Sequence, residues 1–303
     1  SRGLGDVYKR QEYTDEAGNV IEPKVTHIDW DLDMAEKGGY PDFMLKEIHE
    51  QPRVVRDTLV GRMTPAGELD IDELGLSLEE LNDIDRVYVI ACGTSYHAGL
   101  IAKNLIEGWA RIPTEVEAAS EFRYRNPIIT PTTLVVAVSQ SGETADTLAA
   151  IRDARIKGAK VFGITNVVGS PVARESDGVI YTKANKEIAV ASTKSFIGQV
   201  VSLTLLALLL AQVKYRLTTK QARMLFRELS DTAEQIQWIL DTQTDAVHEA
   251  ALLCKDAQSA LFVGRGMGAA ISYEGALKLK EISYLHAEAY PAGETVSYTH
   301  LTL

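Results

Sequence analysis

Hydrophobic residues in this chain alternate between short β-branched runs and longer stretches with helical spacing. The apolar runs predict strands near residues 86–91, 114–118, 133–138, 159–165 and 178–181. Helical spacing predicts helices near residues 96–109, 144–156 and 170–176, followed by a long apolar helix from about residue 192. Strands that alternate with helices are typical of a parallel sheet covered on both faces, so we expect an α/β fold.

Five strands in this rhythm fit a doubly wound, flavodoxin-like sheet with the strand order 2-1-3-4-5. In that order the first and third strands are neighbours, and ligands bind beyond their carboxyl ends. The segments Ala91–Ser95 and Ser139–Thr144 leave those two strands. We therefore expect these two loops to line one pocket.

The region before this sheet has two predicted parts. Residues 1–40 form a polar, acidic stretch without sustained periodicity, so we expect a linker there. From Pro41 onward, hydrophobic residues recur at helical spacing, and Pro52 is expected to bend that helix.

The region after the sheet is predicted to start a second copy of the same fold. A strand near residue 260 leads into Gly264–Gly268 and then a helix, which repeats the order around Gly93 at an offset of 173 residues. Residues 215–255 are expected to form helices that join the two copies. The predicted division is a linker at 1–40, a first domain with flanking helices at 41–255, and an incomplete second copy at 256–303.

Composition narrows the class of protein. The 303 residues are 46% hydrophobic and 24% charged, as in soluble globular proteins. A formal net charge of −11 argues against a nucleic-acid partner. Only two cysteines are present, too few for a disulfide framework, which favours a reducing cytoplasm. Residues 197–213 are strongly apolar, but polar residues interrupt them and they fall short of about 20 residues, so we expect a buried core helix and no membrane partner.

Both predicted loops are rich in small hydroxyl residues and open into helices. A helix N-terminus presents unpaired N–H groups and a positive dipole end, which favour an anion. The second loop offers four hydroxyls, on Ser139, Ser141, Thr144 and Thr147. We expect a phosphate here with sugar hydroxyls beside it, whereas the alternative is that these residues only cap a helix. No segment has the glycine spacing of nucleotide-binding loops, which disfavours a nucleotide.

Two later segments carry further candidate chemistry. Ser192 precedes the long apolar helix, and its simplest interpretation is an N-cap. The helix from about residue 269 carries Glu274, Lys278 and Glu281 at spacings of four and three, which place them on one face. A solvated charged stripe is the simpler interpretation. The alternative is a catalytic face, on which a carboxylate moves a proton between C1 and C2 of a sugar and an ammonium stabilises the oxyanion.

Several segments together resemble one family. They are Cys92–Ser95, Ser120–Arg125, Ser139–Thr147, Val190–Lys194 and Glu274–Tyr284. These segments resemble the isomerase part of the glutamine–fructose-6-phosphate aminotransferase (isomerising) family, also called glucosamine-6-phosphate synthases. Asp29–Gly61 is similar to the linker and first helix of that family, and the resemblance runs from about Val25 to Glu294.

The resemblance implies tandem sugar isomerase (SIS) domains that convert fructose 6-phosphate and ammonia into glucosamine 6-phosphate. It also implies a cytoplasmic homodimer that uses no metal or other cofactor, and the histidines show no metal-ligand spacing. Glu281 would be the proton-shuttling base and Lys278 its neighbour. The residues implied to hold the sugar phosphate are Ser95, Ser139, Gln140, Ser141 and Thr144. Those implied to line the same pocket are Cys92, Gly93, Thr94, Val190, Ala191 and Ser192.

The chain also departs from the family pattern. The glutaminase domain that supplies ammonia is missing, Ser297 stands where a ring-opening histidine is expected, and His300 lies outside the motif. The C-terminal Schiff-base lysine of the family has no counterpart. Ser1–Gln11 and Val296–Leu303 match nothing in the family and resemble non-native ends. We therefore expect a fragment that binds fructose 6-phosphate weakly and does not form the product.

Two other kinds of SIS protein remain as alternatives. A fructosamine-phosphate deglycase would share the serine-rich loops. A non-catalytic sugar-phosphate sensor usually carries a basic helix-turn-helix segment, and the acidic linker shows none.

Overall fold

The computed structural model describes residues 19–20, 37–71 and 73–295. It divides into two compact units, residues 1–38 and 39–303. Every helix and strand named below belongs to the second unit. The expectations for Ser1–Gln11 and Val296–Leu303, including Ser297 and His300, lie outside the described residues. The domain boundaries after residues 40 and 255 stay predictions.

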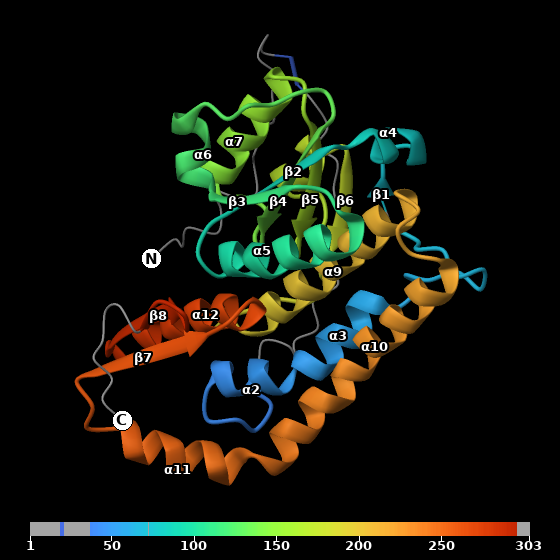
Figure 1. The fold of residues 1–303 in the computed structure, drawn as a ribbon. Coiled ribbons are helices and arrows are strands. Elements are labelled where there is room, and N and C mark those ends of the chain that lie inside the picture. The colour runs from blue at the N-terminus through green and yellow to red at the C-terminus, as the bar shows by residue number, and fades with distance from the viewer. Residues whose placement is uncertain (1–18, 21–36, 72, 296–303) are drawn as a thin grey trace. The chain divides into compact units, whose positions relative to one another are not determined.

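The centre of the second unit is a six-stranded sheet with the strand order β1-β6-β5-β4-β2-β3 (Figure 1). The five expected strands are β2 (Arg86–Ala91), β3 (Thr114–Ala118), β4 (Thr133–Ser139), β5 (Lys160–Thr165) and β6 (Gly178–Tyr181). They are mutually parallel and have the relative order 2-1-3-4-5, which confirms the flavodoxin-like prediction. The sixth strand, β1 (Glu73–Leu74), pairs antiparallel with β6 and was not predicted, because two residues carry no detectable period.

Helices cover both faces of this sheet, which explains why its central strands are continuous apolar runs. All seven residues of β4 are buried, and successive side chains enter opposite layers. Leu134 and Val136 pack in the layer that contains α9 (Lys194–Val213), whereas Val135 and Ala137 pack in the layer that contains α7 (Ala145–Ile156). The helices of the sheet region are α4 (Leu78–Asp83), α5 (Thr94–Leu105), the π-helical η3 (Ile106–Ala110), α6 (Ala119–Arg125), α7 (Ala145–Ile156), α8 (Pro171–Glu175) and α9 (Lys194–Val213). The short helix α6 was not predicted.

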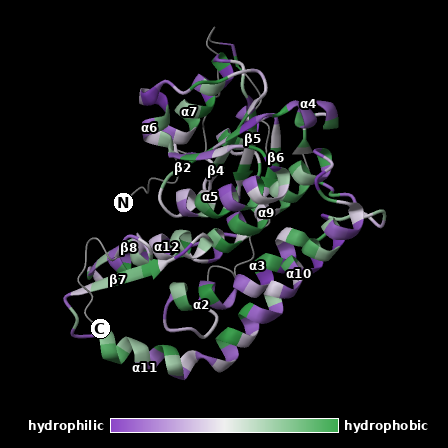
Figure 2. Ribbon diagram, in the orientation of Figure 1, coloured by the Kyte–Doolittle hydropathy of each residue, from purple (hydrophilic) through white to green (hydrophobic). Residues whose placement is uncertain are grey.

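Helix α9 is the apolar segment that raised the question of a membrane. Its length and hydropathy would allow it to span a bilayer, yet 72% of its most apolar window is buried inside the protein. Figure 2 shows α9 as a strongly hydrophobic ribbon between α5 and α3 (Gln51–Leu59). The prediction of a buried core helix is therefore confirmed.

The single helix predicted from Pro41 onward is two helices, which meet at Glu50. Residues Phe43–His49 form α2 and Gln51–Leu59 form α3. Pro52 lies in the first turn of α3, where its missing N–H costs no hydrogen bond. The residue that was expected to bend one helix thus lies in the first turn of a second helix, which begins at Gln51.

The C-terminal part of the described chain has the arrangement expected for a second copy. Its elements are α10 (Thr219–Thr242), α11 (Thr244–Cys254), β7 (Ser259–Gly264), α12 (Met267–Ser283) and β8 (His286–Pro291), with β7 and β8 parallel. Gly93 precedes α5 with φ +56° and ψ −130°, and Gly266 precedes α12 with φ +58° and ψ −126°. The same unusual backbone conformation at equivalent positions supports the repeat.

Candidate functional site

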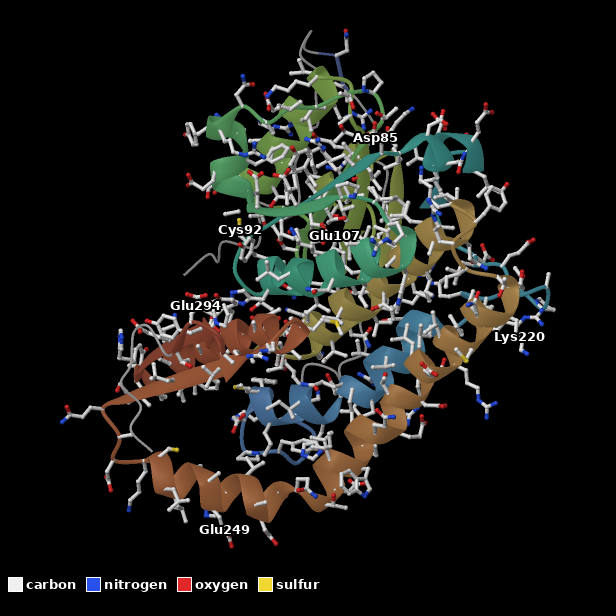
Figure 3. The ribbon with its side chains drawn as sticks, in the orientation of Figure 1. Asp85, Cys92, Glu107, Lys220, Glu249 and Glu294 are labelled. Atoms are coloured by element: carbon white, nitrogen blue, oxygen red, sulfur yellow. The ribbon has the colours of Figure 1, made fainter. Side chains whose placement is uncertain are left out.

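The first predicted loop turns from β2 into α5. Gly93 is the N-cap of α5, and its positive φ is a conformation that favours glycine. Figure 3 labels Cys92 at the carboxyl end of β2, opposite Asp85, which precedes the strand. Cys92 is half-buried and unpaired, and Ser95 is 8% exposed. The hydroxyl of Thr94 contacts residues of α12.

This contact brings the predicted catalytic pair to the first loop. Thr94 Oγ1 donates to Glu274 Oε1 at 2.9 Å and accepts from Lys278 Nζ at 2.9 Å. Lys278 Nζ also lies 2.7 Å from Glu281 Oε2 and 3.3 Å from Glu274 Oε1. The ammonium therefore has an oxygen partner for each of its three protons. Two carboxylates, one ammonium and one hydroxyl form a compact polar cluster between α5 and α12.

The simpler interpretation of this face as a solvated charged stripe is wrong for Glu274. Its residue exposure is 5%, because α12 packs against α5 at this point. Its second oxygen, Oε2, lies 2.7 Å from Nδ1 of His97 on α5. Sequence reasoning missed His97, although its position three residues after Thr94 puts both side chains on one face of the helix.

The second predicted loop forms its own network of hydroxyls and amides. Ser139 Oγ accepts a hydrogen bond from the Gly142 N–H at 3.0 Å and lies 2.9 Å from Thr144 Oγ1. Ser141 Oγ accepts from the Glu143 N–H at 3.2 Å. Thr144 is the N-cap residue of α7, but its side chain makes no capping bond. The capping interpretation therefore fails for Thr144, and the first turn of α7 keeps donors for an anion.

Thr147 does not belong to this network. Its side chain is fully buried, and its hydroxyl has no hydrogen-bond partner within the described residues. The expectation that four hydroxyls surround the start of α7 is therefore wrong. Thr147 lies in the first turn of α7 but faces the core, so three hydroxyls remain at the loop.

The second loop is connected to the ends of β5 and β6. The Asn166 N–H donates to the Gln140 carbonyl at 3.1 Å, and Asn166 Nδ2 donates to the Asn185 carbonyl at 2.6 Å. β4 and β5 are neighbouring parallel strands, as are β5 and β6. The segment that follows β6 and leads to α9 thus leaves the same edge of the sheet as the two loops.

The predicted residues in that segment have different environments. Val190 is 97% exposed, whereas Ala191 is 3% exposed. Ser192 Oγ donates to Glu187 Oε2 at 2.9 Å, and the other oxygen of Glu187 accepts from the Thr193 N–H at 2.8 Å. Helix α9 begins at Lys194 with Thr193 as its N-cap residue, so the expectation that Ser192 is the N-cap is wrong. The carboxylate of Glu187 takes over the capping, because its Oε1 also accepts from the Ser195 N–H at 3.3 Å in the first turn of α9.

The structure therefore places the predicted residues in three groups along one edge of the sheet. Thr94, Lys278 and Glu281 form the first group, the Ser139 loop the second, and Val190–Ser192 the third. A cavity of about 510 Å³ lies beside the first group and is lined by Gly93, together with residues of α5, α12 and β8. Among the described residues, no three His, Cys, Asp or Glu side chains gather in a way that could hold a metal ion.

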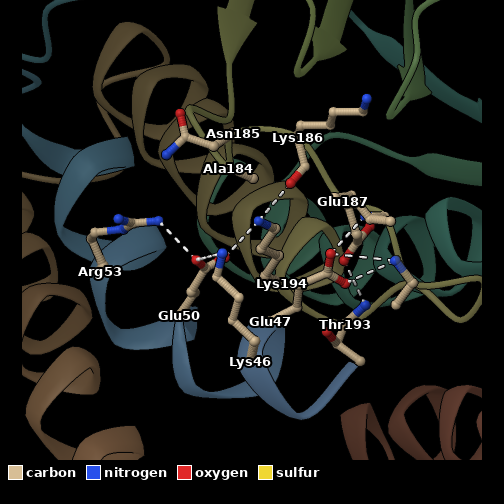
Figure 4. A network of polar contacts seen from close by, with 12 residues as sticks. Lys46, Glu47, Glu50, Arg53, Ala184, Asn185, Lys186, Glu187, Thr193 and Lys194 are labelled. Atoms are coloured by element: carbon tan, nitrogen blue, oxygen red, sulfur yellow. Dashed lines mark hydrogen bonds and ion pairs between the residues drawn. The ribbon is translucent and has the colours of Figure 1, made fainter. Parts of the chain in front are cut away.

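The segment between β6 and α9 also contacts helix α2 (Figure 4). Glu47 on α2 is 2% exposed, and its Oε1 accepts from the Ile188 N–H at 2.6 Å and the Ala189 N–H at 3.3 Å. Burial raises the pKa of Glu47 above its ordinary value and outweighs these two hydrogen bonds, which lower it. The neighbouring charge of Glu187 raises the pKa further, and that of Lys194 lowers it. Sequence reasoning did not identify this contact.

The raised pKa of Glu47 has a testable consequence for stability. A carboxyl whose pKa is higher in the folded state contributes stability that is fully present below its ordinary pKa. That contribution is lost as the pH rises through the raised value. We expect the unfolding free energy of the wild type, minus that of Glu47→Gln, to fall as the pH increases from about 4 to about 7. Urea unfolding of both proteins across this range measures it. A difference that stays constant or grows with pH would contradict the assignment.

Comparison with known proteins identifies a family model and relatives that this chain resembles. Residues 80–209 match the family model described as SIS domain. Relatives named glutamine–fructose-6-phosphate aminotransferase [isomerizing] are 52% identical over 281 residues in Corynebacterium diphtheriae and 49% identical over 280 residues in Clostridium perfringens. These alignments cover 93% and 92% of this chain but 45% and 46% of the relatives. The chain thus spans about half the length of the relatives that it matches.

One solved structure matches this chain over a large share of both chains. The C-terminal domain of glucosamine-fructose-6-phosphate aminotransferase from Francisella tularensis is 41% identical and superposes with a TM-score of 0.82. The superposition covers 86% of this chain and 73% of that domain. Both sequence and fold are therefore shared with that domain over most of its length.

Proposed function

Because the chain belongs to the family of the C-terminal domain of glutamine–fructose-6-phosphate aminotransferases, we propose that it binds fructose 6-phosphate for conversion into glucosamine 6-phosphate. The observation that carries this proposal is the contact of Thr94 with Lys278, whose ammonium is paired with Glu281. At this contact the loop after β2 meets the charged pair on α12. The loop belongs to the first α/β fold, and α12 belongs to the second copy. A sugar isomerase needs a phosphate anchor and, within reach of it, a carboxylate that moves a proton.

In this proposal each group has a separate task. The hydroxyls and amides of the Ser139 loop, with the start of α7, bind the phosphate. The segments Cys92–Ser95 and Val190–Ser192 contact the sugar. Ammonia first condenses with the C2 carbonyl of the open-chain sugar and releases water, which leaves an imine at C2. Glu281 then takes a proton from C1 and returns it to C2, while the proton of the C1 hydroxyl passes to the nitrogen, so that C1 becomes an aldehyde and C2 carries an amine. Lys278 stabilises the negative charge that develops on the C1 oxygen as its hydroxyl loses that proton. A homodimer in the cytoplasm is part of the same proposal, supported by the resemblance and by two unpaired thiols.

Replacing the loop hydroxyls tests the phosphate anchor. We expect fructose 6-phosphate to bind the wild-type chain weakly and the double variant Ser139→Ala/Ser141→Ala about tenfold more weakly still, because hydrogen bonds to a charged group are lost. Titration followed by ³¹P NMR measures both affinities. Ser230→Ala is the matched control, since its hydroxyl donates to the Phe226 carbonyl within α10. Equal affinity of the double variant and the wild type would contradict the anchor, and no binding by the wild type would contradict the proposed function.

A further inference from the structure

We propose that Glu47 and Lys194 position the segment 186–193, so that helix α2 controls the affinity of the sugar site. This inference rests on the proposed function, in which Val190–Ser192 contact the sugar. Neither residue touches those three directly. Their role is to hold the backbone that precedes these three residues, at positions 186, 188 and 189.

The segment depends on side chains for its conformation. Within the part of the chain that the structure describes, residues 187–192 make no backbone-to-backbone hydrogen bond. Two of their amide groups, those of Ile188 and Ala189, instead donate to the carboxylate of Glu47. A strand or a helix would fix these residues through its own hydrogen bonds, but this segment has neither. Removing a carboxylate therefore removes a principal restraint on the backbone.

Lys194 supplies the second anchor (Figure 4). Its side chain is 3% exposed, and its Nζ donates to Glu50 Oε2 at 2.6 Å and to the Lys186 carbonyl at 2.8 Å. Glu50 follows α2 directly and also pairs with Arg53 at 3.3 Å. The ammonium thus joins the end of α2 to the beginning of the segment and to the start of α9. Because it is buried, it cannot replace these partners with water without large cost.

The two anchors make α2 a structural support of the sugar site. Glu47 holds residues 188 and 189, and the Glu50–Lys194 pair holds residue 186. On the other side, Glu187 holds Ser192 and Thr193. Only Val190 and Ala191 lie between these restraints, so their backbone position follows from them. A displacement of α2 would move the part of the pocket that contacts the sugar while leaving the Ser139 loop in place.

Because α2 supports the sugar segment but not the Ser139 loop, binding of the sugar phosphate and binding of phosphate alone should respond differently. General destabilisation of the fold would weaken both. In Glu47→Ala we expect the affinity for fructose 6-phosphate to fall about tenfold and the affinity for inorganic phosphate to stay unchanged. Glu47→Gln keeps one acceptor oxygen, so we expect an intermediate loss, and Lys194→Met should behave like Glu47→Ala. Hydrogen exchange at the amides of Ile188 and Ala189 should become at least about tenfold faster in Glu47→Ala. ³¹P NMR titration and exchange mass spectrometry on the full chain provide the measurements.

Arg53→Met is the matched control, because it removes a partner of Glu50 without touching the segment. It should change neither the affinity nor the exchange. The inference is overturned if wild type and Glu47→Ala bind fructose 6-phosphate equally, or if both ligands are weakened alike. Should the wild type not bind fructose 6-phosphate at all, the proposed function fails with it. The exchange data at Ile188 and Ala189 would then show separately whether Glu47 restrains the segment.

Discussion

Substituting Gly142 with alanine is expected to lower the unfolding free energy by about 2–4 kcal/mol. Two costs combine at this position. Gly142 has φ +67°, where a side chain is strained, and an added Cβ would lie 2.1 Å from Ser170 Oγ and 2.8 Å from Thr165 Oγ1. Ser170 is 3% exposed, so it cannot move aside without disturbing the core. Urea unfolding monitored by circular dichroism measures the loss.

The matched control separates the clash from the backbone strain. Gly158 also has a positive φ, of +93°, but an added Cβ there would meet nothing within 4 Å. Gly158→Ala should therefore show only the backbone cost of about 1 kcal/mol. Adding Ser170→Gly to Gly142→Ala should restore part of the loss, because it removes the nearest atoms. Equal effects of Gly142→Ala and Gly158→Ala would show that the close approach does not matter.

Local patterns in the sequence were sufficient for most of the sheet. The parallel strands are runs of β-branched residues between turns, and their order follows from the rules for doubly wound sheets. Strand β1 was not predicted, because its two residues are too few to show an alternation of polar and apolar side chains. The start of α9 was placed two residues early, because the capping group is the side chain of Glu187 and not that of Ser192.

The candidate site was predictable only where its residues are close in sequence. The loop hydroxyls follow strands directly, and the face of Lys278 and Glu281 follows from helical spacing. His97 and Glu274 are 177 residues apart, and Glu47 and Ile188 are 141 apart. No local period links such pairs, because the packing of one element on another brings them together. Their roles therefore required the three-dimensional structure.

The cluster between α5 and α12 should also respond strongly to substitution. We expect Lys278→Met to lower the unfolding free energy by about 2–4 kcal/mol, since it leaves the buried carboxylate of Glu274 without its ammonium. The side chain of Glu274 is 7% exposed and that of Glu281 is 33% exposed, so most of the loss should come from Glu274. The methionine keeps most of the apolar stem, which limits the change in packing. Urea unfolding provides the measurement.

Two further variants separate charge burial from other effects of Lys278→Met. Lys280 is exposed on the same helix, so Lys280→Met should change stability by less than about 0.5 kcal/mol. Adding Glu274→Gln to Lys278→Met removes the unpaired charge, and the double variant should be more stable than Lys278→Met alone. If Glu274→Gln instead adds its own loss to that of Lys278→Met, the two side chains are not coupled. The ammonium would then stabilise α12 through Glu281 and Thr94 without balancing the buried carboxylate.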